Sequence, residues 1–132
     1  MKVTFVSNYI NHHQIPFSKA FCNMPDVEYC FIKTQPMEEE RVKMGWGLDP
    51  KSLPFVKLLY EGEEECRKLI DESDIMLIGW MEREDLVKER LESGKFTIRM
   101  SERLYREGQY KFISPRGLIR KYKEHTRFRN GN

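Results

Sequence analysis

A short polar loop near the start of the chain carries side chains that could accept a proton and bind hydroxyl groups. It lies between an apolar run at residues 3–6 and Pro16, and its polar members are Asn8, Asn11, His12, His13 and Gln14. An imidazole titrates near neutral pH and is a common general base, while amides both donate to and accept from hydroxyl groups. We take His12 and His13 as candidate catalytic residues and the three amides as candidate substrate-binding residues. The alternative is a solvated loop, which is the commoner fate of two adjacent histidines.

A second set of reactive or binding side chains follows two later apolar runs. Trp80 comes after the run at residues 74–79, and Ser101, Glu102 and Arg103 come after the run at residues 96–100. A carboxylate can act as a general base, and an indole offers a flat surface to a sugar ring. We take Glu102 as a further candidate catalytic residue, and Trp80, Ser101 and Arg103 as candidate substrate-binding residues. The alternative for Glu102 is an ion pair with Arg103 or with Arg99.

Apolar periodicity predicts the elements that hold these loops. Strands are expected at residues 3–6, 27–32, 55–60, 74–79 and 96–100, and helices at residues 16–23, 62–73, 82–93 and from residue 115 onward. The run at residues 74–79 is almost continuously apolar, which is typical of a strand covered on both faces of a parallel sheet. This order predicts the α/β class, with a mostly parallel sheet and helices on both faces. A length of 132 residues indicates a single domain.

In such a sheet the carboxyl ends of the strands share one edge, so the candidate residues are expected to converge on one crevice. Their mixture of amides, imidazoles, carboxylates, an arginine and an indole suits a hydroxyl-rich ligand. The chain lacks the glycine-rich fingerprint of a nucleotide site. It also lacks the acidic pair after the first strand that a phosphoacceptor receiver domain uses. No cofactor and no metal ion is predicted.

The segment at residues 33–54 interrupts the alternation of strands and helices. It holds three prolines and an acidic cluster, followed by Gly45-Trp46-Gly47. A loop of this length inside a compact domain is usually functional or mobile. Trp46 is expected either to stack on a sugar ring or to fix the loop to the core.

Charge is distributed unevenly along the chain, although the net charge is only +2. From Arg116 to Arg129 there are six basic residues and one acidic residue, and the remainder carries 17 basic and 20 acidic residues. Such a basic helix, at about residues 115–129, indicates an anionic partner. The candidates are lipid headgroups, phosphates and nucleic acid. We predict an anionic membrane surface as this partner and no nucleic acid. The alternative is a solvated helix face.

Other features of the composition bear on the compartment. No apolar run approaches the roughly 20 residues that a membrane span needs. The three cysteines lack C-x-x-C spacing, which suits reduced thiols packed in the interior of an intracellular protein. No leader segment is evident at the amino terminus. We therefore expect a cytoplasmic protein, with its basic helix at the inner face of a membrane.

Several stretches together resemble the N-terminal domain of GT-B fold glycosyltransferases of bacterial capsule and cell-surface polysaccharide synthesis. They are the opening MKVTFVSN with the following HHQIPF, the run SDIMLIG at residues 73–79, and SERL at residues 101–104. The resemblance covers essentially the whole chain. It implies a Rossmann-like domain that binds the sugar acceptor, with Asn8, His12 and His13 in the acceptor loop and Ser101, Glu102 and Arg103 bordering the same cleft.

In that family a second Rossmann-like domain binds the nucleotide-sugar donor, and its motifs are absent from these 132 residues. The resemblance thus implies that the isolated chain binds the acceptor and lacks the donor half needed for transfer. In an inverting enzyme the base would be His12, His13 or Glu102. The alternative hypothesis is a non-catalytic Rossmann-like module that binds a glycan, a lipid-linked sugar or a partner protein.

Overall fold

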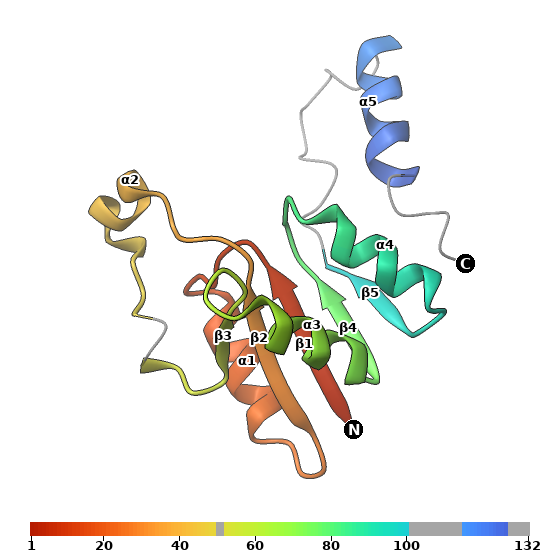
Figure 1. Cartoon of the computed structure of the whole chain (residues 1–132). Coiled ribbons are helices and arrows are strands. Elements are labelled where there is room, and N and C mark those ends of the chain that lie inside the picture. Colours follow the sequence, from red (N-terminus) through yellow and green to blue (C-terminus); the bar gives the residue numbers. More distant parts are fainter. Residues whose placement is uncertain (50–51, 101–114, 127–132) are drawn as a thin grey trace.

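A computed structural model describes residues 1–49, 52–100 and 115–126 (Figure 1). Its centre is a sheet of five strands in the order β3-β2-β1-β4-β5. The strands are β1 Lys2–Ser7, β2 Glu28–Lys33, β3 Val56–Leu58, β4 Ile75–Ile78 and β5 Thr97–Arg99. Every pairing among them is parallel. The predicted α/β, Rossmann-like fold is confirmed, and the described sheet is wholly rather than mostly parallel.

Helices cover both faces of the sheet because alternate strand residues point to opposite sides. Helix α1 (Gln14–Cys22) covers one face, and α3 (Glu63–Glu72) and α4 (Glu84–Glu92) cover the other (Figure 1). The core on the α1 face contains Val3, Phe5, Ile10, Tyr29, Phe31 and Leu77. The core on the opposite face contains Val6, Ile32, Leu59, Cys66, Ile70, Met76, Ile78, Met81, Leu86 and Val87. The strand order places β1 at the centre of the sheet, with β4 beside it.

A buried arginine fastens α4 to the amino-terminal ends of two strands. Arg90 is 3% exposed. Its Nη1 donates to the carbonyl oxygen of Ile70 at 3.0 Å, and its Nη2 donates to those of Ser73, Asp74 and Phe96 at 2.9, 3.2 and 3.2 Å. The guanidinium thus satisfies carbonyls from the end of α3 and from the segments that enter β4 and β5. Its burial lowers the pKa of Arg90 below the usual value.

A network of surface ion pairs joins α3 to α4. Arg67 contacts Asp85 and Glu89, each at 2.6 Å, and also Glu63 of its own helix at 2.9 Å. Arg83 contacts Asp85 at 2.7 Å and Glu63 at 2.8 Å. The two guanidiniums lower the pKa of the Asp85 carboxyl well below its usual range, Arg83 making the larger contribution. These ion pairs link the two helices at the surface of the domain.

Several element boundaries differ from the sequence-based expectation. Helix α1 begins at Gln14 rather than Pro16, because the proline occupies the first turn, where its missing N–H costs nothing. The long segment contains a short helix α2 (Glu39–Arg41) and a π-helical turn η1 (Val42–Trp46). Of the three cysteines, only Cys66 is buried, and Cys22 is exposed, so the expectation that all of them pack inside is wrong.

The C-terminal basic segment forms α5 (Pro115–Thr126) within the described residues. Positions 127–129 of the predicted basic helix lie outside the described residues. In the described part of the chain no helix has both the length and the apolar character needed to cross a bilayer.

Candidate functional site

A cavity of about 570 Å³ lies at the carboxyl edge of the sheet, where β1, β4 and β5 end. Its described lining consists of Phe5, Ser7, Asn8, Asn11, Gln14, Gly79, Trp80, Arg99 and Met100. Four of the predicted substrate-binding residues, the three amides and Trp80, therefore meet at one site. The volume is that of a pocket for a small molecule such as one or two sugar rings.

Backbone hydrogen bonds hold the loop after β1 against the loop after β4. The N–H of Asn8 donates to the carbonyl oxygen of Trp80 at 2.6 Å, and Ser7 Oγ donates to the same oxygen at 3.1 Å. The N–H of Gly79 donates to the carbonyl oxygen of Val6 at 2.9 Å. These bonds fix the backbone from which the Asn8 and Trp80 side chains project.

Gly79 makes this close approach of the two loops possible. A Cβ atom at this position would lie 2.5 Å from Ser7 Oγ, 2.9 Å from Ser7 Cβ and 3.1 Å from Phe5 Cε2. All three atoms belong to well-packed residues of β1, so none can give way cheaply. This position of the cavity lining therefore requires glycine for lack of space and not for its backbone freedom.

Two of the lining amides cap the turn at residues 11–14 that leads into α1. Asn11 Oδ1 accepts hydrogen bonds from the N–H groups of His13 and Gln14, at 3.0 and 3.1 Å. Gln14 Oε1 accepts in return from the N–H of Asn11 at 3.0 Å. This reciprocal arrangement is a capping box, which satisfies donors that the first turn of a helix leaves open. The two amide oxygens are thus engaged in the fold, and their NH2 groups are the parts that can serve a ligand.

The side-chain oxygen of Asn8 is also engaged within the protein. Its Oδ1 accepts from the N–H of Tyr9 at 2.8 Å and from Ser7 Oγ at 3.4 Å. Among the described residues no acceptor is found for its Nδ2. Trp80 lines the same cavity and is 61% exposed, so an indole surface is open to solvent. An amide donor and an exposed aromatic ring in one cavity are a suitable combination for a sugar.

The two histidines occupy the same loop but lie outside the described lining of the cavity. Both are exposed, and their rings are 3.9 Å apart between centroids. The His12 ring also meets the ring of Trp46 edge-on at 5.8 Å. The Arg41 guanidinium lies 5.5 Å from the ring centre of Tyr9 and 5.7 Å from that of Trp46. Residues 39–46 therefore contact the loop after β1 through Arg41 and Trp46, while Trp46 itself is 42% exposed and belongs to neither core.

The predicted residues Ser101, Glu102 and Arg103 lie outside the described residues. The two residues directly before them, Arg99 and Met100, line the cavity. Sequence reasoning considered Arg99 only as an ion-pair partner and did not select Met100, Phe5, Ser7 or Gly79 for the site. Their position at the ends of predicted strands was the signal available for them.

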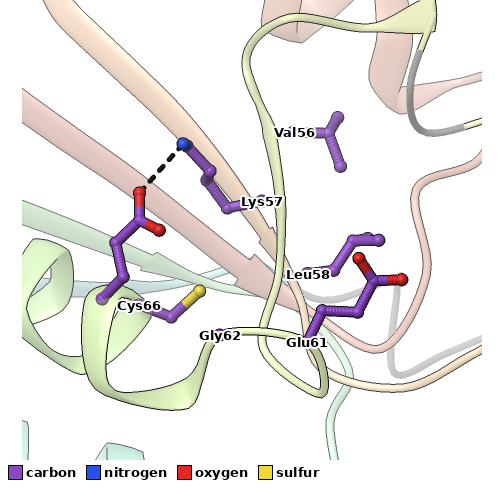
Figure 2. A pocket seen from close by; sticks show the side chains of 7 residues that line it. Val56, Lys57, Leu58, Glu61, Gly62 and Cys66 are labelled. Carbon is purple, nitrogen blue, oxygen red and sulfur yellow. Dashed lines mark hydrogen bonds and ion pairs between the residues drawn. The ribbon is translucent and has the colours of Figure 1, made fainter.

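A second cavity, of about 350 Å³, lies beside the edge strand β3 and the start of α3 (Figure 2). Figure 2 labels Val56, Lys57, Leu58, Glu61, Gly62 and Cys66 around it. The Lys57 ammonium is paired with the Glu65 carboxylate at 2.9 Å, so this charge pair is satisfied within the protein. Burial, and then the nearby Glu65, raise the pKa of the Cys66 thiol to about 11, so it is a protonated packing residue near pH 7. This cavity offers fewer converging ligand groups than the one at the carboxyl edge.

Within residues 1–49, 52–100 and 115–126, no three His, Cys, Asp or Glu side chains gather in a way that could hold a metal ion. No protein-family model, curated protein or solved structure matches the chain.

Proposed function

We propose that this chain is the acceptor-binding half of a GT-B type glycosyltransferase. In this proposal a sugar passes from a nucleotide-sugar donor, held by a second domain, to a polysaccharide or lipid-linked acceptor in the cavity at the carboxyl edge. The observation that supports the proposal is the meeting of Asn8, Asn11, Gln14 and Trp80 around one cavity of about 570 Å³.

Each of these side chains has a role in the proposed binding. The indole of Trp80 would cover one face of a sugar ring. The Nδ2 of Asn8, for which the described residues supply no acceptor, would donate to a hydroxyl group. The capping box holds Asn11 and Gln14 rigid, so their NH2 groups lose little conformational entropy when a ligand arrives. Arg99 gives this part of the lining its only formal charge among the described residues, and it is a donor to hydroxyl or acidic groups of the acceptor.

The proton acceptor of an inverting reaction would be His12, His13 or Glu102. The two histidines lie on the acceptor loop, and His12 packs against Trp46. Both histidines follow the lining residue Asn11 directly in the chain, so either ring would act from beside the cavity. Glu102 follows the lining residue Met100 by two positions.

A second candidate function is a non-catalytic module that binds a glycan. It is favoured by one observation: the described lining contains neither a carboxylate nor an imidazole. The two proposals share the sugar site and differ in the rest of the gene product. A donor-binding domain encoded with this one would support the transferase, and a gene product without it would support the binding module.

The shared sugar site is tested by saturation-transfer NMR with a panel of methyl glycosides of glucose, galactose, N-acetylglucosamine and rhamnose. We expect at least one of them to receive saturation from the wild-type chain. Trp80→Ala should weaken its binding about tenfold, equivalent to about 1.4 kcal/mol. Trp46→Ala is the matched control, since Trp46 is also exposed but lies outside the described lining. Equal losses in the two variants, or no binding by the wild type, would contradict the proposal.

A further inference from the structure

Helix α5 combines a high positive charge with an exposed apolar surface, which ordinary solvated helices lack. Its twelve residues, Pro115–Thr126, include four basic residues and one acidic residue. Pro115 occupies its first position, and Thr126 Oγ1 donates to the carbonyl oxygen of Tyr122 at 2.7 Å near its end. At 1.5 Å per residue the helix is about 18 Å long, which is too short to span a bilayer but sufficient to lie on one.

The apolar residues of α5 are not buried in the domain. Leu118, Ile119 and Tyr122 are 55%, 57% and 68% exposed. Their spacing of i, i+1 and i+4 places them on one side of the helix, within an arc of about 100°. A helix with such an apolar stripe normally packs it against a core. Here the three side chains are exposed, so the stripe is available to a partner.

Two exposed basic residues border the stripe. Viewed along the helix axis at 100° per residue, Lys123 lies about 40° from Ile119, and Arg116 lies about 60° from Ile119 in the same direction. Both side chains are exposed. A narrow apolar stripe with basic residues along its border, and with a tyrosine in the stripe, is the pattern of helices that lie in the headgroup region of a membrane.

We propose that α5 binds the surface of an anionic lipid bilayer, with Leu118, Ile119 and Tyr122 inserted at the headgroup boundary and Arg116 and Lys123 facing acidic headgroups. Charge complementarity selects this partner. The segment from Arg116 to Arg129 has a net charge of +5 and the rest of the chain −3, so an anionic surface attracts this helix and repels the body. The inference does not depend on what the cavity at the carboxyl edge binds.

The first experiment is co-sedimentation of the whole chain with phosphatidylcholine vesicles that contain or lack phosphatidylglycerol, at low and at high salt. We expect binding only to the anionic vesicles and a loss of binding at high salt, because exposed charges are screened within about 10 Å at moderate ionic strength. Lys123→Gln should weaken binding about fivefold, the effect of one basic charge at a membrane surface. Lys88→Gln is the matched control, since Lys88 is an exposed lysine on α4 and should leave the affinity unchanged.

The apolar contribution is tested with Leu118→Ser combined with Ile119→Ser. These side chains are exposed, so the fold should survive the change, and circular dichroism checks this. We expect vesicle binding to fall at least tenfold, because the variant removes most of the apolar area that would enter the lipid. If binding is unaltered, or if the wild type binds neutral vesicles equally well, the proposal is overturned.

A depth measurement separates insertion from loose electrostatic attraction. Tyr122→Trp in a Trp46→Phe, Trp80→Phe background leaves one indole, located in the stripe. Lipids brominated near the headgroup should quench its fluorescence. An unquenched indole would overturn the proposal. Pairing of two chains through the apolar stripe would also overturn it. Light scattering would detect such pairing as a dimer in the wild type and a monomer in the serine variant.

Discussion

Asn11 and Gln14 cap the same helix turn through each other: Asn11 Oδ1 accepts from the N–H of Gln14 at 3.1 Å, and Gln14 Oε1 accepts from the N–H of Asn11 at 3.0 Å. Both residues also line the cavity at the carboxyl edge of the sheet. Their contribution to folding and their contribution to ligand binding can therefore be separated by the atom that is changed.

Replacing Asn11 by Ala should lower the free energy of unfolding by about 1 kcal/mol, because a cap is lost. Asn11→Asp keeps the accepting oxygen and adds a negative charge at the positive end of the helix, so stability should be retained. The same Asp variant removes the NH2 group, and saccharide affinity should fall if that group serves the ligand. Urea unfolding and glycoside titration of both variants make the comparison. A stable Asp variant with full affinity would restrict Asn11 to capping.

Gly79→Ala should destabilise the protein by about 1–3 kcal/mol, the range for overpacking a well-packed site. The added methyl group would lie 2.5 Å from Ser7 Oγ and 3.1 Å from Phe5 Cε2. Gly62→Ala is the control, since the nearest atom to its added Cβ is 3.9 Å away. Adding Ser7→Gly to Gly79→Ala should relieve part of the strain. Urea midpoints measure all three, and a harmless Gly79→Ala would show that the two loops separate easily.

Arg90→Met should be among the most destabilising single changes, costing about 3 kcal/mol or more. It removes the donors for the carbonyl oxygens of Ile70, Ser73, Asp74 and Phe96; the bonds to Ile70 and Ser73 are buried and the other two are partly buried. Arg90→Lys should be only partly tolerated, because an ammonium has three donors and cannot reproduce the fork of a guanidinium. Equilibrium denaturation checks both, with Lys88→Met on the exposed side of α4 as the control.

Asp85 should make stability depend on pH in the acidic range. Arg83 and Arg67 lower its pKa in the folded protein below the ordinary 3.8, so the unfolded chain binds a proton first as the pH falls. The stabilisation is fully present above about pH 5 and is lost progressively as the pH falls below about 4 toward the folded pKa. Since Asp85 is 41% exposed, solvent screening limits the effect to about 1 kcal/mol. The free energy of unfolding of the Asp85→Asn variant should fall less steeply than that of the wild type over this acidic range. Parallel curves of unfolding free energy against pH for the two proteins would contradict the assignment to Asp85.

His12→Ala should leave the fold and the saccharide affinity nearly unchanged, because the exposed ring lies outside the described lining. It should alter the fluorescence of Trp46, whose ring it meets at 5.8 Å. With the donor-binding domain present, loss of a general base should lower turnover by about 10²–10⁴. Activity that survives both His12→Ala and His13→Ala would leave Glu102 as the candidate base, tested by Glu102→Gln.

The sequence by itself determined the class of fold and the loops that line the cavity at the carboxyl edge. The apolar run of β4 and the alternation of strands and helices depend on short-range periodicity, which is readable from neighbouring residues. Because parallel strands end at one edge, the same pattern also located the loops that carry Asn8, Asn11, Gln14 and Trp80.

Only the tertiary structure decided what the individual side chains do. Ser7 and Trp80 are joined by a hydrogen bond across 73 positions of sequence, Arg90 is buried among carbonyls of three segments, and His12 meets a tryptophan of the long segment. It also decided that Leu118, Ile119 and Tyr122 are exposed although their spacing is that of a buried stripe. Such partners depend on which distant surfaces meet, and local propensity carries no information about them.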